Sequence, residues 1–441
     1  MKKELYQFQL DALDQIKDQE NILLAAEMGT GKTVMSIEQS ERWNSQILVC
    51  LVLKSTLYQW LDELANQTER KIFNGYKKTK KDGVQAFMDS TERRALVIGY
   101  DAYKTTTNAP LRKFLSSHSD DVTMICDESS LIGHMKSFRT KAVMKTETRH
   151  KILLSGTPCT GGKMESLVPT MNLLGWKITQ DEFLYQFCDV YQWCDPARPW
   201  TVIPIIQGYK DIDKLRQGLK EHGTVFLTME EAGVQLPETT EQKISLHTPM
   251  GYKKFIKTGI TRINGIDIVG ENSLTRMLYA RQICSIYNVE KETAVTELLE
   301  QAGDEPVLIF YNWTAELEIL EDICKRLKKP LSVVNGKKKD LSEYDNGTPG
   351  TVILAQYQAA AMGLNLQKCR IAIFFSPCLS YSDYEQAQAR IHRIGQKRNC
   401  IFYNLICQDS VEEDIMETLA QRQDYTDQLF DRKYKVKKFA A

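Results

Sequence analysis

The 441-residue sequence has no long apolar run, no paired-cysteine motif and no excess of one charge. No apolar segment reaches the ~20 residues that a membrane helix needs, and the N-terminal residues do not begin a signal peptide. Eleven cysteines without a C-x-x-C spacing indicate reduced thiols, so we expect an intracellular, cytoplasmic protein with no membrane partner. Basic and acidic side chains number 57 each, which excludes a uniformly polycationic chain but not a local basic groove.

The composition is that of a globular protein, with 42% hydrophobic and 26% charged residues and no repeats or low-complexity tracts. A chain of this length is expected to form two or three domains. We predict an α/β fold made of two doubly wound, parallel-sheet units. The first is residues 1–236, with a helical insertion at about 179–236, and the second is residues 237–441, with a helical insertion at about 245–288. The linker is expected around residues 230–240, where Gly and Pro interrupt the pattern.

Short runs that are apolar on both faces, separated by helical patterns, support this fold. They lie at residues 21–24, 47–53, 95–98, 122–126 and 152–154 in the first half, and at 307–310, 331–334, 352–354, 371–375 and 401–405 in the second. Such runs are typical of parallel strands covered by helices on both faces of a sheet. Between the halves, aromatic residues lie in segments without strand alternation, which favours helices with a packed aromatic core over a base-stacking platform.

The glycine-rich stretch AAEMGTGKT (residues 25–33) follows the first apolar run and precedes a helical pattern. Strand, glycine loop, Lys-Thr and helix is the layout of a phosphate-binding P-loop, in which backbone N–H groups and a helix N-terminus surround an anion. Lys32 would bind the β- and γ-phosphates of a nucleotide, and the Thr33 hydroxyl would bind Mg²⁺. The strict pattern has Gly where this chain has Ala26, and the alternative is a glycine turn that only caps a helix.

A carboxylate pair, Asp127-Glu128, directly follows the strand predicted at 122–126. At the carboxyl end of a parallel strand, the pair should face the same crevice as the P-loop. Asp127 would hold Mg²⁺ through water, and Glu128 would orient and deprotonate an attacking water. Ser155-Gly156-Thr157-Pro158 follows the next predicted strand and would link the nucleotide to the far side of the crevice, although a plain turn has the same pattern.

The second half contains the stretch QAQARIHRIGQ at residues 386–396. Arg390 and Arg393 are three residues apart, so they should share one helix face. Two guanidinium groups in a unit that has no P-loop of its own suit arginine fingers that act on a γ-phosphate. The alternative is a surface helix with salt bridges, and His392 alone would be structural.

In their order along the chain, these motifs resemble those of a helicase superfamily-two motor of the Swi/Snf type, with a DEAD/DEAH-like helicase core, over nearly the whole sequence. The stretches that carry the resemblance, each with the family pattern, are LYQFQLDA at 5–12 (L-R-P-Y-Q-x-E-G), AEMGTGKT at 26–33 (D-E-M-G-L-G-K-T), LKSTLYQW at 53–60 (P-x-S-L-x-x-N-W), GYD at 99–101 (S-Y-E), SGTP at 155–158 (T-G-T-P), ARQIC at 280–284 (L-R-Q-I-C), VLIF at 307–310 (V-L-I-F), MGLNL at 362–366 (G-G-x-G-I-N-L), QAQARIHRIGQ at 386–396 (Q-A-x-x-R-x-H-R-x-G-Q) and VEE at 411–413 (V-E-E). The resemblance implies two RecA-like lobes with ATP and Mg²⁺ at their interface and DNA, duplex or forked, in a groove across them.

The resemblance also assigns roles to single residues. Gln9 would read adenine, and Gln386 would place the attacking water. The ATP-binding residues implied are Gln9, Met28, Gly29, Thr30, Gly31, Lys32, Thr33 and Gly363, and the catalytic residues are Lys32, Asp127, Glu128, Gln386, Arg390 and Arg393. The DNA-contacting residues implied are Lys54, Ser55, Trp60 and Tyr100 in the first lobe and Asn312, Trp313 and Gln356 in the second.

Three stretches depart from the family pattern. Ser129-Ser130 replace Ala/Gly-His after the carboxylate pair, which puts a polar relay in doubt. Residues 225–228 replace Arg-Arg-x-Lys, which puts a brace between the lobes in doubt, and residues 358–362 replace R-A-G-G. No chromatin-reading, nuclease or zinc module is recognisable, as in prokaryotic or phage members of the family, for which the location would be the host cytoplasm if the chain is phage-encoded.

The resulting prediction is an ATP-dependent, DNA-stimulated motor that translocates on double-stranded DNA and remodels DNA or DNA–protein complexes, with replication or repair proteins as partners. The alternative within enzymes is a strand-separating helicase that acts on forked or single-stranded DNA, with its wedge in a short hairpin between Lys71 and Lys81. The alternative from another class is a non-catalytic, nucleotide-switched DNA clamp. An intact Glu128, Arg390 and Arg393 argue against the clamp.

Overall fold

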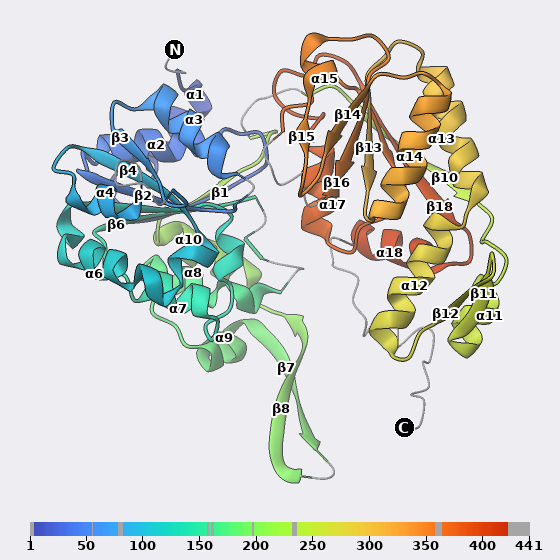
Figure 1. Cartoon of the computed structure of the whole chain (residues 1–441). Helices are drawn as coiled ribbons and strands as arrows, with labels where there is room; N and C mark the ends of the chain where they lie inside the picture. Colours follow the sequence, from blue (N-terminus) through green and yellow to red (C-terminus); the bar gives the residue numbers. More distant parts are fainter. Residues whose placement is uncertain are drawn as a thin grey trace. The chain divides into compact units, whose positions relative to one another are not determined.

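The chain forms two compact units, Met1–Gln235 and Leu236–Ala441, in a computed structural model (Figure 1). We describe each unit by itself. Among the described residues, no helix is both long and apolar enough to span a membrane. The structure describes residues 4–54, 56–77, 83–156, 158–159, 163–195, 198–231, 236–357 and 364–421.

The first unit is built on a seven-stranded sheet with the order β3-β4-β2-β5-β6-β1-β9, in which every neighbouring pair is parallel. Its central strands are short and buried on both faces, as the apolar runs predict. The strands are β1 (Asn21–Ala26), β2 (Ile47–Val52), β3 (Lys71–Asn74), β4 (Arg94–Gly99), β5 (Val122–Cys126), β6 (His150–Ser155) and β9 (Thr224–Leu227).

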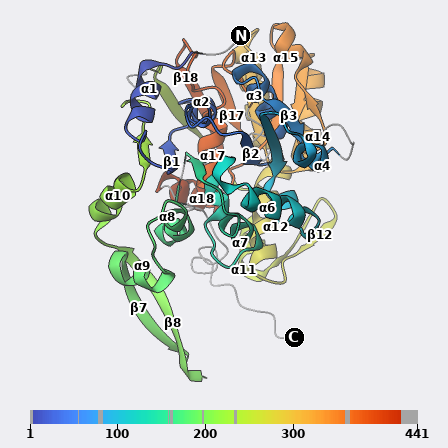
Figure 2. The same ribbon diagram turned by 90° about the vertical axis from the view of Figure 1, so that its left-hand side faces the viewer.

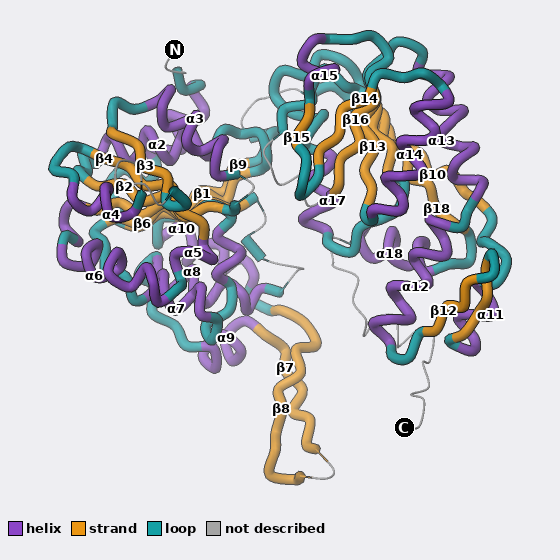
Figure 3. The backbone as a smooth tube through the Cα atoms, viewed as in Figure 1, coloured by secondary structure: helices purple, strands orange, loops and turns teal. Residues whose placement is uncertain are grey.

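Helices cover both faces of this sheet, and each face has its own hydrophobic core (Figure 3). Ile22 and Leu24 of β1 pack with the core that includes α1, α2 and α3, whereas Leu23 packs with the core that includes α6, α7 and α8. Alternate burial of one strand in two cores is the signature of a doubly wound sheet. The helices are α1 (Gln7–Asp14), α2 (Lys32–Arg42), α3 (Leu57–Gln67), α4 (Val84–Asp89), α5 (Tyr100–Tyr103), α6 (Ala109–Ser117), α7 (Phe138–Met144), α8 (Val168–Leu173), α9 (Gln180–Phe187) and α10 (Ile212–Glu221).

The segment predicted as a helical insertion contains a long β-ribbon as well as helices. Strands β7 (Cys188–Asp195) and β8 (Arg198–Tyr209) pair antiparallel, and Figures 1 and 2 show the ribbon extending away from α9 and the rest of the first unit. The helical prediction is wrong for these residues because a two-stranded ribbon with little cover on either face does not impose a period-two burial pattern. The aromatic residues divide accordingly: Phe183 and Phe187 are core residues, whereas Tyr191 and Trp193 on β7 are exposed.

The second unit has a seven-stranded sheet with the order β10-β18-β17-β13-β16-β14-β15, which is parallel except for the β14–β15 pair. Val307 and Ile309 of β13 pack in one core while Leu308 and Phe310 pack in the other, so this sheet is doubly wound too. The predicted fold class, an α/β chain with two doubly wound, largely parallel sheets, is confirmed. The strands are β10 (Thr239–Leu246), β13 (Val307–Tyr311), β14 (Leu331–Val334), β15 (Lys339–Asp340), β16 (Val352–Gln356), β17 (Ile371–Phe374) and β18 (Cys400–Cys407).

The insertion predicted at about 245–288 is helical at both ends and has a hairpin in the middle. Strands β11 (Ile260–Ile263) and β12 (Ile266–Val269) pair antiparallel through Asn264-Gly265, where both residues have positive φ, 52° and 81°. Asn-Gly favours this turn because both residues tolerate the left-handed region. The helices in the described part of this unit are α11 (Tyr252–Thr258), α12 (Ser273–Ile286), α13 (Val289–Ala302), α14 (Thr314–Arg326), α15 (Ser342–Asn346), α17 (Tyr381–Gln388) and α18 (Val411–Ala420).

Candidate nucleotide site

The P-loop lies between β1 and α2, and both of its glycines have backbone conformations that residues with side chains rarely adopt. Gly29 has φ of 87°, and Gly31, the N-cap of α2, has φ of 85°. A Cβ atom on Gly31 would lie 2.3 Å from Nε2 of Gln9, so the loop is packed against α1 as well as tightly turned. The sequence pattern therefore corresponds to a true glycine loop at a helix N-terminus, the arrangement that accepts phosphate.

Hydrogen bonds hold this loop from both sides. Gln9 donates from Nε2 to the Thr30 carbonyl at 2.7 Å, and its Oε1 accepts from the Tyr6 N–H at 2.9 Å. The Thr30 hydroxyl donates to the Glu27 carbonyl at 2.7 Å. Lys32 donates from Nζ to the Ala26 carbonyl at 2.6 Å, so its ammonium lies over the loop. Gln9 thus has a structural role in addition to the adenine contact that the resemblance implies.

Asp127 lies at the carboxyl end of β5 and forms hydrogen bonds through both its backbone and its side chain. Its N–H donates to the Leu51 carbonyl at 2.9 Å, its carbonyl accepts from the Tyr100 hydroxyl at 2.7 Å, and its Oδ2 accepts from the Trp60 indole Nε1 at 2.8 Å. Burial raises the pKa of the Asp127 carboxyl, an effect that the Trp60 hydrogen bond and the Lys32 charge oppose. The carboxylate is therefore stabilised by a neutral donor and a nearby cation.

Glu128 has a left-handed backbone, with φ of 47° and ψ of 58°, just before the short 3₁₀ helix at Ser129–Ile132. This conformation is uncommon for a residue with a side chain, and such strain clusters at functional sites. The turn at Glu128 comes directly after Asp127 at the carboxyl end of β5, and the role of this carboxylate beside a nucleotide stays a prediction.

The P-loop, Asp127 and the Ser155-Gly156 turn follow β1, β5 and β6, which are neighbours in the sheet. A Cβ atom on Gly156 would lie 3.4 Å from the Met28 side chain and 3.5 Å from Lys32 Nζ, so this turn contacts the P-loop directly. The Ser155 hydroxyl is buried and has no hydrogen-bond partner among the described residues. Thr157 lies outside the described residues.

Two of the four predicted DNA contacts of the first unit, Trp60 and Tyr100, need correction. Trp60 and Tyr100 are 1% and 2% exposed and belong to the two cores of the unit, so neither presents a surface to DNA. The resemblance assigned both residues to DNA, and the sequence pattern could not show that both side chains bond to Asp127 instead. Lys54 is exposed, and Ser55 lies outside the described residues. A hairpin was suggested between Lys71 and Lys81, of which residues 71–77 are described. These residues contain no hairpin strand, because Lys71–Asn74 forms β3 of the parallel sheet.

In the second unit, Gln386 belongs to α17, whereas Arg390 and Arg393 follow its end at Gln388. The prediction that the two arginines share one helix face is therefore wrong, because both lie beyond the end of the helix. The non-helical path is held by the Leu366 N–H, which donates to the Arg390 carbonyl at 3.1 Å. The Gln396 amide also donates to the carbonyls of Cys369 (2.8 Å) and Gln367 (3.0 Å). Gln386 and Arg390 are buried at 8% and 9% exposure.

Asn312, Trp313 and Gln356 lie together at the carboxyl ends of β13 and β16. Gln356 donates from Nε2 to the Asn312 carbonyl at 3.0 Å, and Asn312 donates from Nδ2 to the Ser376 hydroxyl at 2.8 Å. The Trp313 ring lies 4.8 Å from the Arg281 guanidinium. Their contact with DNA stays a prediction. Gly363, the remaining predicted ATP-binding residue, lies outside the described residues.

A buried charge cluster in the second unit was not expected from the sequence. Lys291 and Glu412 are both fully buried and lie 2.7 Å apart from Nζ to Oε1, and Lys291 also donates to the Phe375 carbonyl at 2.7 Å. Glu412, Cys284 and Cys407 are the one group among the described residues whose ligand atoms lie close enough together to hold a metal ion. The Lys291 ammonium already neutralises Glu412 there, which disfavours a cation.

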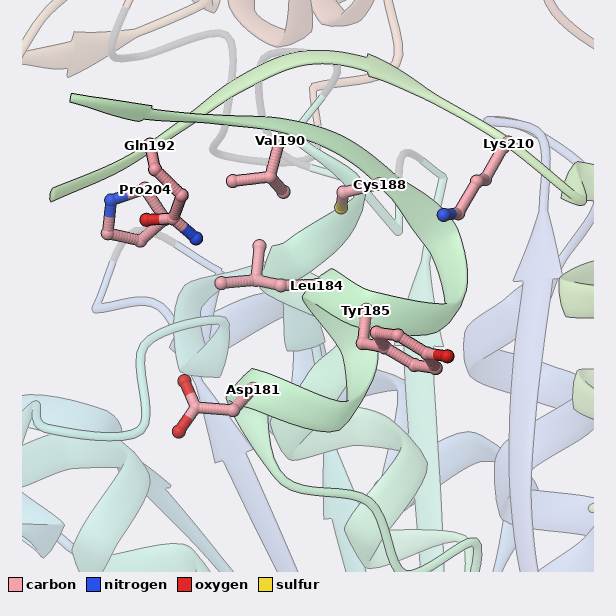
Figure 4. A pocket seen from close by; sticks show the side chains of 8 residues that line it. All are labelled: Asp181, Leu184, Tyr185, Cys188, Val190, Gln192, Pro204 and Lys210. Carbon is pink, nitrogen blue, oxygen red and sulfur yellow. The ribbon is translucent and has the colours of Figure 1, made fainter. Parts of the chain in front are cut away.

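A pocket of about 500 Å³ lies between α9 and the base of the β7–β8 ribbon. Figure 4 shows its side chains: Leu184, Cys188 and Val190 provide apolar walls, and Asp181 and Lys210 lie at its margin. None of its lining residues belongs to the P-loop or to the carboxylate pair. This pocket is therefore separate from the nucleotide site.

Three features define the class of this protein: the glycine loop bonded to Gln9, the buried Asp127 carboxylate near that loop, and the two largely parallel sheets. Together they are those of a P-loop protein of the helicase-like ATPase class. The chain belongs to the SNF2-related family: the SNF2-related domain matches residues 7–292, and the helicase conserved C-terminal domain matches residues 290–395. The predicted Swi/Snf-type resemblance is confirmed.

Curated relatives match along most of the chain at low identity. The ISWI chromatin-remodeling complex ATPase ISW1 of Saccharomyces cerevisiae is 23% identical over 91% of this chain and 38% of its own length. The DNA repair and recombination protein RAD54-like of Homo sapiens is 22% identical over 94% of this chain and 64% of its own length. A solved structure, the Sulfolobus solfataricus SWI2/SNF2 ATPase core in complex with dsDNA, is 20% identical, with 99% of this chain and 96% of that chain covered and a TM-score of 0.44. The chain thus spans less than two-thirds of these curated relatives.

Proposed function

We propose that this chain is a DNA-stimulated ATPase that converts ATP hydrolysis into movement along double-stranded DNA. The observation that carries the proposal is that the P-loop and the Asp127-Glu128 pair follow the carboxyl ends of strands in one parallel sheet, β1 and β5, which both pair with β6, in a chain of the SNF2-related family. Relatives named as chromatin-remodelling ATPases and as DNA repair proteins support a DNA substrate. A motor that moves along DNA without reading its sequence would contact mainly the phosphates. Its affinity for DNA should therefore fall as the salt concentration rises.

The residues present fit Mg-ATP. Thr33 and Asp127 supply the hard oxygen ligands that Mg²⁺ prefers, and the bound ion would neutralise charge on the phosphates. Lys32 exchanges its loop carbonyls for phosphate oxygens, and Glu128 orients a water and takes its proton. Arg390 and Arg393 supply positive charge to the transferred phosphoryl group, and Gln386 helps to place the water.

The test is steady-state ATP hydrolysis without nucleic acid and with duplex, single-stranded and forked DNA and RNA, with Glu128→Gln as the blank. Strong stimulation by blunt duplex, lost in the variant, is the expected result. A triplex-displacement assay on blunt duplex should then succeed. If no nucleic acid raises the rate above that of Glu128→Gln, the motor is excluded and a nucleotide-switched clamp replaces it.

One feature favours a second candidate, the strand-separating helicase. The β7–β8 ribbon carries exposed rings at Tyr191 (53%) and Trp193 (37%), which could stack on separated bases as a wedge would. Under this alternative, Tyr191→Ser/Trp193→Ser should abolish unwinding of a forked substrate and leave triplex displacement intact. No unwinding by the unaltered protein would remove the candidate.

A further inference from the structure

Asp127 receives one side-chain hydrogen bond from each face of the first sheet. Trp60 comes from α3 and packs in the core on one face, and Tyr100 comes from the start of α5 and packs in the core on the other. Trp60 donates to the carboxylate Oδ2 at 2.8 Å, and Tyr100 donates to the backbone carbonyl at 2.7 Å. The residue is held at both its backbone and its side chain by groups that are at most 2% exposed.

We propose that Trp60 and Tyr100 are positioning residues that fix the Asp127 carboxylate for the metal ion of the nucleotide. The inference rests on the ATP site of the proposed function but not on DNA. Neither residue touches the reacting atoms, since each acts through Asp127.

The chemistry of the indole explains why a tryptophan suits this place. An indole N–H can only donate, so the Trp60 hydrogen bond to Oδ2 cannot reverse, and the carboxylate keeps its remaining lone pairs for an ion or its water. A hydroxyl or imidazole could reverse its hydrogen-bond role and release the carboxylate. Because the ring is packed in the core, its rotamer is locked, and the carboxylate orientation is set before nucleotide arrives.

Tyr100 works on the backbone in a complementary way. The Asp127 N–H is already bonded to Leu51 of β2, and the Tyr100 hydroxyl holds the carbonyl on the other side of the same residue. The chain turns sharply at Glu128, immediately after this carbonyl. Because this carbonyl lies between the Cα atoms of Asp127 and Glu128, fixing it fixes the positions from which both carboxylate side chains branch.

The test compares Trp60→Phe and Tyr100→Phe with Tyr103→Phe. Tyr103 is a matched control because it lies in the same short helix, is 1% exposed and bonds through its hydroxyl to Thr146 at 2.7 Å, away from Asp127. Each protein is titrated with a fluorescent ATP analogue, first in EDTA and then at rising Mg²⁺ concentrations, without DNA. The affinity of the analogue is the readout, and thermal unfolding checks each fold.

For Trp60→Phe we expect the Mg²⁺ concentration at half-maximal effect to rise about tenfold, the usual loss when a partner of a metal ligand is removed. Affinity in EDTA should stay unchanged, and Tyr100→Phe should give a smaller shift of the same kind. A purely structural role predicts a lower unfolding temperature with no change in Mg²⁺ dependence, as expected for Tyr103→Phe, and this outcome for both variants would overturn the inference.

If Trp60→Phe does not fold, Tyr100→Phe alone decides, because loss of its hydroxyl changes no packing volume of the ring. Failure here is distinguishable from failure of the proposed function. If the wild-type protein binds Mg-ATP but DNA does not stimulate its ATP hydrolysis, the proposed translocase is excluded. The test of Trp60 and Tyr100 is still valid in that case.

Discussion

Single residues at the nucleotide site combine tight packing with unusual backbone conformations. Gly31 and Glu128 both have positive φ, and Asp127 between the two cores is held by three separate elements. Strain of this kind persists only where the surroundings determine it fully. Substitutions here should therefore change binding more than they change the stability of the fold.

Gly31→Ala and Gly265→Ala separate backbone strain from site chemistry. Both glycines have φ above 80°, so each substitution should lower the free energy of unfolding by about 1–2 kcal/mol. A Cβ on Gly31 would meet Gln9 Nε2 at 2.3 Å, whereas nothing lies within 4 Å of a Cβ on Gly265. Urea unfolding should show the larger loss for Gly31→Ala, because the clash with Gln9 adds to the backbone strain, and nucleotide titration should show lost binding for Gly31→Ala alone. Equal nucleotide affinity in the two variants would contradict the geometry.

Removing one partner of the buried Lys291–Glu412 pair should lower the free energy of unfolding. Lys291→Met leaves a buried carboxylate without its cation and should cost about 3–5 kcal/mol of unfolding free energy, much of which Lys291→Met/Glu412→Gln should restore. Burial alone would lower the pKa of Lys291, but the Glu412 charge raises it above its usual value. The contribution of the pair is thus complete below the unfolded pKa of about 10.4 and declines as pH rises through the folded pKa.

Urea unfolding from about pH 8 to about pH 11 measures this decline. The stability difference between the wild type and the double variant should change only at the alkaline end. A constant difference across the range would show that the pair does not titrate with unfolding.

At the scale of elements, the sequence predicts the strands that are buried in a core and misses the strands that are not. Strands such as β2 and β13, buried on both faces, were predicted almost to the residue. The β7–β8 ribbon was missed because it has little cover, although Asn264-Gly265 was an available signal for the β11–β12 hairpin. In the site, the P-loop and Asp127 were predicted by spacing. The inward direction of Trp60 and the end of α17 before Arg390 depend on tertiary contacts that spacing does not contain.

The ribbon should be removable without loss of the fold. Residues 191–205 can be replaced by Asn-Gly, which would join Val190 to its partner Ile206 in a tight turn. Because β7 and β8 pair only with each other among the described strands, the unfolding temperature should fall by less than about 4 °C and basal ATP hydrolysis should persist. Differential scanning calorimetry and the ATPase assay check this, and loss of the P-loop unit's cooperative transition would show that the ribbon supports the core.

At the scale of the whole molecule, the residues proposed to carry out the chemistry are divided between two units. The P-loop and the carboxylate pair belong to Met1–Gln235, whereas Gln386, Arg390 and Arg393 belong to Leu236–Ala441. Each unit has its own two cores, so each has the apolar interior that an independent fold requires.

Residues 1–235 expressed alone should bind an ATP analogue but should not hydrolyse ATP faster when duplex DNA is added. The reason is that the arginines proposed to stabilise the transferred phosphoryl group are missing. Fluorescence titration and the ATPase assay measure the two properties. DNA-stimulated hydrolysis by this fragment would remove the arginines from the catalytic role.

The strand that leads out of the first unit is a neighbour of the strand that leads into the P-loop. β9 pairs with β1 from Leu23↔Thr224 to Ala26↔Leu227, and Glu27 then bonds through its N–H to the Leu227 carbonyl at 2.9 Å and through Oε2 to the Met229 N–H at 2.8 Å. In the second unit the chain enters through β10, which is bonded along eight residue pairs to β18. In mechanical terms, a pull along the axis of β9 or of β10 would be resisted by many backbone hydrogen bonds together, and the strand beside β9 leads into the phosphate loop.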